Sequence, residues 1–340
     1  MQYVYTLTST HNDDYYEQFL LSATSLKLLM PNANVILLCD SKTKETLTGK
    51  RCEYEKLVFK TITVDAPGDL SQLEVSRWVR TSMRRFIQGD FLFLDGDTIV
   101  TGDLSSVFDC GINFGACLDK HFLIGGHSKR DSILSKNAHL GFDSHISNKH
   151  FNGGVLFCAD TPAVHKIFDR WHDLWLFSKS KNILRDQPSL NMAIYENQSF
   201  FTELDGTWNC QIAYNGLPYL ANSKIIHYFA TDMLFQSSPF IFASDDIFKK
   251  IKNVGLIPND VLEILKNPRT AFVPESRIIA GNTMLDVINS DLFGFVFLMR
   301  KKIPRLFNFF NSLITFGKKI IKFFLVKKSK NKDGGTKFYN

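Results

Sequence analysis

The sequence predicts an α/β fold with a mostly parallel central sheet. Residues 2–8 are typical of a strand, and residues 15–30 carry apolar side chains at helical spacing. Residues 35–39 then form a continuous apolar run, which is typical of a strand covered on both faces. This strand–helix–strand order favours parallel pairing with the helix packed on the sheet.

Later segments continue the alternation. We expect further strands at residues 56–64, 91–94, 114–118 and 151–158, short strands within 201–215 and 224–229, and helices at 71–88, 162–178 and 187–195. Residues 119–150 are polar and contain five histidines. We expect this stretch to be an irregular functional loop or lid whose histidines, lacking metal-ligand spacing, face either solvent or a hydrogen-bond acceptor.

Composition narrows the function classes. Of the 340 residues, 44% are hydrophobic, enough for a sizeable core. The segment from Arg300 onward has a net charge of +11 within a total of +6, so residues 1–299 carry −5. A nucleic-acid-binding protein would not confine its positive charge to one end. The six cysteines form no metal-type pair, and the N-terminus has no signal-peptide pattern, so we expect a reduced, cytosolic protein without zinc.

Two carboxylates directly follow the apolar run at 91–94. Asp95 and Asp97 are separated by one residue, so both side chains of an extended chain point to the same side. Two carboxylates in one site repel each other unless a cation lies between them. Oxygen ligands suit Mg²⁺ or Mn²⁺, which usually retain room for phosphate oxygens. The pair therefore predicts a metal site for a nucleotide diphosphate.

Four further motifs follow in a fixed order. The five motifs are Asp95-Gly96-Asp97, Phe151-Asn152-Gly153-Gly154-Val155, Asp186-Gln187-Pro188-Ser189-Leu190-Asn191, Leu204-Asp205-Gly206-Thr207-Trp208-Asn209 and Ile225-Ile226-His227-Tyr228. Over residues 1–235 this order resembles glycosyltransferase family 8, which includes bacterial lipopolysaccharide galactosyl- and glucosyltransferases and glycogenin. The resemblance implies a GT-A fold and retaining, Mn²⁺-dependent transfer from a UDP-sugar.

The resemblance also implies a metal-ligand set. Asp95 and Asp97 match the metal-binding carboxylates, with Asp95 also near the ribose, and His227 matches a third ligand. Because imidazole suits softer ions, this set favours Mn²⁺ over Mg²⁺. A bound metal would act as a Lewis acid on the leaving diphosphate.

The donor-binding residues follow from the same match. Thr6, Leu7, Thr8, Ser9 and Gly96 fall where the family binds the nucleotide, and Tyr15, with Tyr16 as the alternative, where an aromatic ring stacks on uracil. Asp40, at the end of the second strand, is either a nucleotide ligand or a solvated acid. Arg77 or Arg80 is positioned to hold a phosphate or carboxylate, or both belong to a solvated helix face.

The sugar-binding residues lie in the second and third motifs. Asn152 matches a contact to a sugar hydroxyl, Gly153 allows close approach beside it, and Asp186 matches a donor-sugar ligand. Gln187 falls near the anomeric carbon. Because an amide is a poor nucleophile, Asp186 is the nearby carboxylate that could form a covalent intermediate. By analogy with the family, we favour front-face transfer instead.

One departure concerns the diphosphate. In the bacterial galactosyltransferases a glycine and a lysine closely follow the motif histidine, whereas here no lysine follows His227 before Lys249. Either another part of the chain binds the diphosphate, or the loop is remodelled.

The C-terminal segment mixes apolar residues with lysines. In residues 291–328 no uncharged run reaches the roughly 18–20 residues that would span a bilayer. A basic amphipathic helix at a membrane surface is the favoured interpretation, and a helix packed on the body is the alternative. We therefore expect a transferase domain at 1–240, a helical extension packed on the core at 241–290, membrane-associating helices at 291–328 and a disordered tail at 329–340.

The expected function is transfer of a hexose, glucose or galactose, from a UDP-sugar to a saccharide acceptor, lipid-linked at the inner face of the cell membrane, in surface glycan biosynthesis. Three alternatives remain: an inverting GT-A transferase, a nucleotidyltransferase, and a membrane-bound binding protein with an inactive site. Residues 9–14 contain neither glycine nor a basic side chain, apart from His11, which argues against a nucleotidyltransferase loop.

Overall fold

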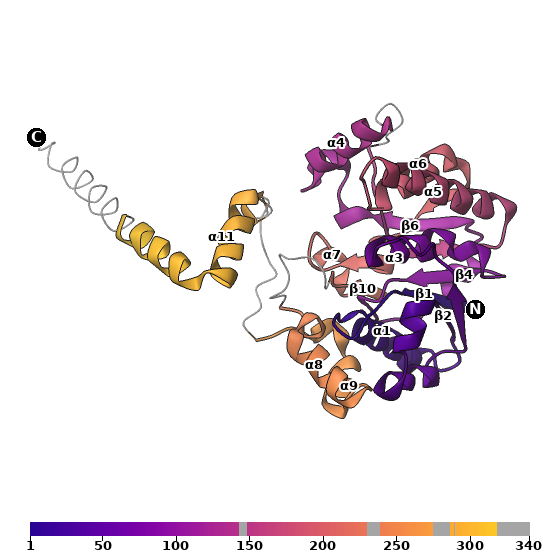
Figure 1. The fold of residues 1–340 in the computed structure, drawn as a ribbon, viewed down its shortest axis with the longest axis horizontal. Coiled ribbons are helices and arrows are strands. Elements are labelled where there is room, and N and C mark those ends of the chain that lie inside the picture. Colours follow the sequence, from indigo (N-terminus) through magenta and orange to yellow (C-terminus); the bar gives the residue numbers. More distant parts are fainter. Residues whose placement is uncertain (143–147, 230–238, 275–285, 289, 318–340) are drawn as a thin grey trace, which may run out of the picture. The chain divides into compact units, whose positions relative to one another are not determined.

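A computed structural model describes residues 1–142, 148–229, 239–274, 286–288 and 290–317. The chain forms two compact units, Met1–Ile278 and Ile279–Asn340. The first holds the sheets and the predicted site, and the second holds the C-terminal helices (Figure 1).

Seven strands of the first unit form a central sheet, in the order β3-β2-β1-β4-β7-β6-β8. Their bounds are β1 Gln2–Leu7, β2 Asn34–Asp40, β3 Lys60–Val64, β4 Phe91–Leu94, β6 Phe114–Leu118, β7 Phe151–Cys158 and β8 Phe201–Glu203. All neighbours pair in parallel except β7, which is antiparallel to both β4 and β6. The predicted mostly parallel α/β sheet is confirmed.

A smaller sheet closes one end of the site. It consists of β5 (Thr98–Val100), β10 (Ile225–His227) and β9 (Cys210–Gln211), in the order β5-β10-β9. Its antiparallel register pairs His227 with Thr98. This pairing brings the end of the fifth motif beside the first, although they lie far apart in the sequence.

Helices cover both faces of the central sheet (Figure 1). The described α-helices of the first unit are α1 Tyr15–Leu29, α2 Ser41–Thr46, α3 Gln72–Ser82, α4 Arg130–Leu140, α5 Pro162–Ser180, α6 Gln187–Glu196, α7 Leu217–Leu220, α8 Asp245–Val254 and α9 Asn259–Leu265. Alternating side chains of β1 explain the two layers: Tyr3, Tyr5 and Leu7 join a core with α1, α8 and α9, whereas Val4 joins a core with α3, α5 and α6.

Two elements differ from the sequence-based expectation. Residues 49–56 form a 3₁₀ helix, so the strand expected from residue 56 begins only at Lys60. The stretch 119–150 is not wholly irregular, because it contains α4, which ends at Gly141 in the left-handed conformation. α4 was missed because it carries few apolar residues at helical spacing. His127 and His150 are buried rather than solvated.

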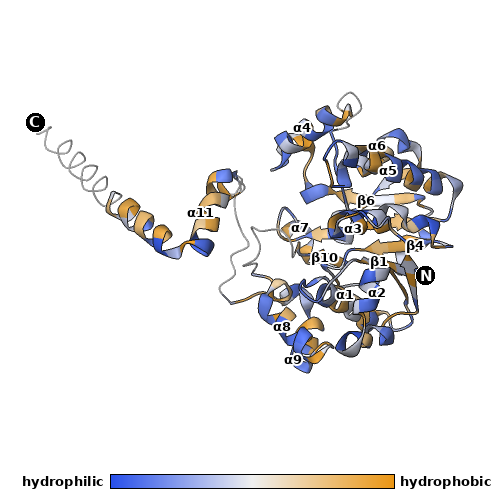
Figure 2. Cartoon of the chain, in the orientation of Figure 1, coloured by the Kyte–Doolittle hydropathy of each residue, from blue (hydrophilic) through white to orange (hydrophobic). Residues whose placement is uncertain are grey.

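The second unit is helical where it is described. α11 spans Asp291–Lys302, and residues 304–317 form another helix after Ile303. Large apolar side chains, including Leu292, Phe295 and Phe316, are more than half exposed. Apolar and charged stretches alternate along these helices (Figure 2). Among the described residues, no helix combines the length and apolar character needed to cross a membrane.

Candidate active site

Asp95, Asp97 and His227 form one cluster. β4 ends at Leu94, the turn places both carboxylates beyond its carboxyl end, and the β5–β10 pairing brings in His227. One ligand atom from each residue lies within 4.8 Å of the others. Two carboxylates and one imidazole are a donor set that fits a divalent cation with mixed oxygen and nitrogen preference.

The His227 ring is held from several sides. Its Nδ1 lies 3.1 Å from Asn209 Oδ1, and its Nε2 lies 3.2 Å from Asp97 Oδ1. Phe229 stacks on the ring at a centroid distance of 4.0 Å, and a Cβ on Gly154 would overlap it. Gly154 is therefore the glycine that gives the imidazole its space.

Charge neighbours control the acids and bases of this cluster. Burial opposes ionisation of Asp97, but the charge and hydrogen bond of His227 outweigh it and hold the pKa of that carboxyl below its ordinary value. Burial lowers the pKa of the Arg80 guanidinium to about 10, against the opposing effect of Asp186. Asp97 is thus an anion, and Arg80 a cation, at neutral pH.

Both candidate arginines reach the site. Arg77 and Arg80 are three residues apart, so they share one face of α3. Arg77 Nε lies 3.1 Å from Asp186 Oδ1 and Arg80 Nη1 lies 3.7 Å from Asp186 Oδ2, while Arg80 also bonds Asp95. The solvated-face alternative does not hold for either side chain. Instead, Arg77 and Arg80 hold the carboxylates of Asp186 and Asp95 in place.

A cavity of about 310 Å³ adjoins the cluster. Its wall includes Thr6, Leu7, Thr8, Tyr15, Arg77, Arg80, Asp95, Gly96 and Asp97. The Thr8 hydroxyl is buried and has no hydrogen-bond partner in the described part of the chain. A nucleoside that enters this cavity would find that hydroxyl available for hydrogen bonding.

Three nearby residues have structural contacts instead. Ser9 is buried, is absent from the described wall, and donates its hydroxyl to Asp13 at 2.7 Å. Tyr16, the alternative to Tyr15, is buried and donates to the Arg51 carbonyl at 2.6 Å. Asp40 is neither solvated nor in the wall, because it caps α2 through Thr43.

A smaller cavity of about 120 Å³ connects the cluster to the sugar-binding motifs. Asn152, Gly153, Asp186, Gln187 and His227 all lie in its wall. This cavity adjoins the nucleotide-sized cavity, because Arg77, Arg80 and both metal-type carboxylates line both of them. Apart from Ser9, Tyr16 and Asp40, the residues predicted for the site therefore line these two cavities.

Asn152 belongs to a hydrogen-bond chain that the sequence did not reveal. Its Oδ1 accepts from the Gly154 backbone N–H at 2.9 Å and from Asn209 Nδ2 at 3.0 Å. Its Nδ2 donates to Asp119 Oδ1 at 2.8 Å, and His127 Nε2 donates to Asp119 Oδ2 at 2.9 Å. The chain thus runs from His227 through Asn209 and Asn152 to the Asp119–His127 pair.

A third cavity, of about 470 Å³, opens beyond Gln187. It shares Asn152, Arg185, Gln187 and Phe229 with the small cavity, and Asp119 and His127 lie in its own wall. Asn209 is part of the fourth motif, but the sequence assigns it no role, and Asp119 lies in the stretch expected to be irregular. Their partners come from distant segments, so only the fold reveals them.

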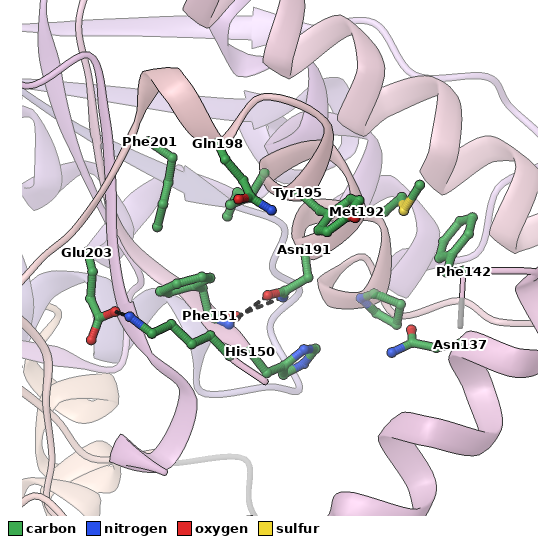
Figure 3. Close-up of a pocket in the computed structure, with 13 residues that line it drawn as sticks. Asn137, Phe142, His150, Phe151, Asn191, Met192, Tyr195, Gln198, Phe201 and Glu203 are labelled. Atoms are coloured by element: carbon green, nitrogen blue, oxygen red, sulfur yellow. Dashed lines mark hydrogen bonds and ion pairs between the residues drawn. The ribbon is translucent and has the colours of Figure 1, made fainter. Parts of the chain in front are cut away.

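Asn191 joins the two elements that carry the predicted sugar-binding motifs. Its side chain accepts from the Phe151 N–H at 2.7 Å and donates to the Phe151 carbonyl at 3.0 Å and the Gln187 carbonyl at 2.9 Å. Figure 3 shows it beside Phe151 in a neighbouring cavity of about 380 Å³. Asn191 therefore fixes the start of α6, with Gln187, against the start of β7, with Asn152.

The family model described as glycosyl transferase family 8 matches residues 10–232. The chain belongs to glycosyl transferase family 8. It is therefore a glycosyltransferase, and its family with the GT-A fold uses a divalent metal ion, a nucleotide-sugar donor and a saccharide acceptor. The Asp95, Asp97 and His227 cluster is where this family member presents carboxylate and imidazole ligands together.

One solved structure supports the fold at a TM-score of 0.50, and two others are similar to the chain at lower scores. An active-site mutant of LgtC matches at a TM-score of 0.50 and 14% identity, over 76% of this chain and 98% of that one. The galactosyltransferase LgtC with donor and acceptor sugar analogues matches at 0.48 and 13%, over 77% and 99%. Mouse xyloside xylosyltransferase 1 matches at 0.43 and 15%, over 67% and 96%. No curated protein sequence matches the chain.

Proposed function

We propose that this glycosyltransferase moves glucose or galactose from a UDP-sugar to a saccharide acceptor, with retention of configuration, in surface glycan biosynthesis. One observation carries the proposal: the Asp95, Asp97 and His227 cluster lies between the nucleotide-sized cavity and the Asp186–Gln187 segment. A UDP-sugar spans that arrangement with its diphosphate beside the cluster.

The contacts of Asp186 favour front-face transfer over a covalent intermediate. Its two oxygens face Arg77 at 3.1 Å and Arg80 at 3.7 Å. A carboxylate held in two ion pairs is a poor nucleophile, because attack would separate it from both cations. In front-face transfer the acceptor oxygen bonds to the anomeric carbon, the bond to the UDP oxygen breaks, and the acceptor proton passes to the departing diphosphate.

The metal is proposed to be Mn²⁺, because the ligand set contains an imidazole. Bound there, it would stabilise negative charge on the leaving diphosphate as a Lewis acid. The chain's own residues prepare this site: Asn209 and Phe229 fix the His227 ring, and Arg80 holds Asp95. The lysine that the galactosyltransferases use after the motif histidine has no counterpart in this sequence before Lys249.

UDP release tests the proposal directly. The purified protein with Mn²⁺ is offered UDP-glucose, UDP-galactose and their N-acetyl forms, beside an Asp97→Ala variant. Slow hydrolysis of one donor that disappears in the variant would identify the sugar. If no donor is hydrolysed and none raises the melting temperature, the UDP-sugar assignment is wrong.

We also propose that the C-terminal unit attaches the enzyme peripherally to the inner face of the cell membrane, where the acceptor is lipid-linked. The support is chemical: α11 exposes Leu292 and Phe295, and Arg300, Lys301 and Lys302 form its last turn. Apolar side chains beside basic ones suit an anionic interface, where each basic residue adds on the order of 1 kcal/mol. A helix packed on protein remains the competing arrangement.

Vesicle sedimentation distinguishes the two arrangements. The full chain should bind vesicles containing phosphatidylglycerol more than neutral ones, and less as salt rises. A Phe295→Asp variant should lose most of this binding, whereas Leu217→Asp, an exposed apolar residue of α7, serves as the matched control. Equal binding of the Phe295→Asp variant would refute membrane attachment through α11.

A further inference from the structure

The cavity beyond Gln187 is placed to receive the acceptor. Its volume is about 470 Å³, and four of its wall residues also line the small cavity that contains Asp186 and His227. A molecule in it would lie beside Gln187, and none of the residues in its described wall lines the nucleotide-sized cavity. This inference rests on the proposed transferase function, which requires an acceptor at that position.

The wall of this cavity is strongly basic. Lys120, Lys129, Lys136 and Arg185 line it, and Asp119 is the one acid among the described wall residues. Asp119 is held by His127 and Asn152, and its single negative charge leaves the four cations in excess. Residues 1–299 carry a net charge of −5, so this local excess is not a general property of the body.

Lys136 and Arg185 are the cations best placed for a ligand. Neither forms a hydrogen bond or ion pair within the described residues, whereas the Lys120 ammonium bonds Ser128 and faces the Tyr214 ring at 3.7 Å. Burial, followed by the charges of Arg185 and Lys129, lowers the pKa of Lys136. The positive charges of Lys129, Lys136 and Arg185 therefore lie in one cavity and repel one another. This repulsion costs free energy unless an anion lies between them.

Donor binding does not account for this group. Lys129 and Lys136 line only the outer cavity, and neither is in the described wall of the nucleotide cavity or of the small cavity. Arg185 lies at the boundary, in the walls of both the small and the outer cavity. An anion between Lys136 and Arg185 would thus sit on the acceptor side of Gln187.

We propose that the acceptor saccharide carries an anionic substituent, a phosphate or a carboxylate, that binds between Lys136 of α4 and Arg185 before α6. The substituent would orient the acceptor so that a hydroxyl faces the small cavity. This assigns α4, which the sequence did not predict, to acceptor selection.

Sugar binding to the full chain tests this proposal. Calorimetric titrations in UDP and Mn²⁺ would compare glucose 6-phosphate, glucose 1-phosphate, glucuronate and glucose, and the three anions distinguish phosphate from carboxylate and one position from another. We expect at least one anionic sugar to bind roughly tenfold more tightly than glucose, as one or two charge-assisted hydrogen bonds predict. Lys136→Ala and Arg185→Ala should each remove that preference, and Lys166→Ala, an exposed lysine of α5, should retain it.

Two results would overturn the proposal. One is equal affinity for all four sugars. The other is that Lys136→Ala weakens UDP binding as much as sugar-anion binding, which would place the cations on the donor. Failure of the proposed function is separately visible, because it appears as absent UDP-sugar hydrolysis, and a preference for an anionic sugar that persists in that case still establishes the anion site.

Discussion

Two imidazole–carboxylate pairs lie at opposite ends of one hydrogen-bond chain, and they differ in which ring nitrogen carries the proton. At one end His127 Nδ1 accepts the Lys129 backbone N–H at 3.0 Å, so its Nε2 donates to Asp119. At the other end His227 Nδ1 faces the Asn209 carbonyl oxygen, so Nδ1 carries the proton. The two histidine–aspartate pairs thus carry the ring proton on different nitrogens, Nε2 in His127 and Nδ1 in His227.

The Gly154 backbone N–H fixes this difference. It donates to Asn152 Oδ1, which orients the Asn152 amide, and Asn209 then donates to the same oxygen and turns its own carbonyl toward His227. With its proton on Nδ1 alone, the His227 ring would point the lone pair of Nε2 at Asp97 from 3.2 Å. The Asp119 end is complete without a ligand, whereas the His227 end needs a proton or a metal ion between imidazole and carboxylate.

Replacing Asp97 should have the largest effect. Asp97→Ala removes one ligand and half of the pair, and we expect donor hydrolysis to fall on the order of a thousandfold, since a group that stabilises leaving-group charge supplies several kcal/mol. Mn²⁺ should raise the melting temperature of the wild type but not of the variant. The exposed Asp109 provides the control Asp109→Ala, and a Mn²⁺ shift that survives in Asp97→Ala would remove Asp97 from the metal site.

Breaking the chain at Asn209 should have the next largest effect. Asn209→Leu removes the acceptor that holds the His227 tautomer, so Mn²⁺ affinity should fall by roughly 10–100-fold while both carboxylates remain. Electron paramagnetic resonance of free Mn²⁺ measures this directly. Asn222→Leu, at an exposed position, is the control. Unchanged affinity in Asn209→Leu would contradict the tautomer argument.

The two ends also differ in how far the sequence predicted them. Asp95, Asp97 and His227 could be found because closely spaced carboxylates after an apolar strand, and ordered motifs, are local signals. The Asp119–His127 pair could not, because Asn152, which donates to Asp119, comes from β7, and Asn209, which donates to Asn152, comes from the segment before β9. The mostly parallel sheet was foreseeable from strand–helix alternation. α4 lacked an apolar stripe, and the 3₁₀ helix at residues 49–56 moves the start of β3 to Lys60.

Removing the charge of Asp119 tests how much the Asp119–His127 pair contributes to stability. Asp119→Asn keeps the shape but weakens the bonds from His127 and Asn152, so the free energy of unfolding should fall by about 1–3 kcal/mol. Urea unfolding measures the loss, with the exposed Asp173→Asn as control. Mn²⁺ affinity should fall less than in Asn209→Leu. A larger fall would mean that the chain transmits the change to His227, and the two ends would not be independent.

The smallest expected effect is on the pH dependence of stability, and it concerns His150, which lies near Asp119. Burial lowers the pKa of His150 to about 4 from 6.5, so the unfolded chain takes up this proton first as pH falls. Its contribution to stability is therefore complete above about pH 6.5 and is lost as pH falls toward 4. The pKa of Asp119 is also lowered, by His127 and other donors against burial, so its carboxylate remains charged across this window.

Replacing His150 should reduce that pH dependence without abolishing it, because burial likewise lowers the pKa of His121 and His172 to about 4. Urea midpoints at pH 7 and pH 5 should lie closer together in His150→Phe than in the wild type, and His139→Phe, at an exposed position of α4, should match the wild type. If the urea midpoint of His150→Phe falls between pH 7 and pH 5 by as much as that of the wild type, proton uptake by His150 is not linked to unfolding. The pH dependence would then come from the other buried histidines alone.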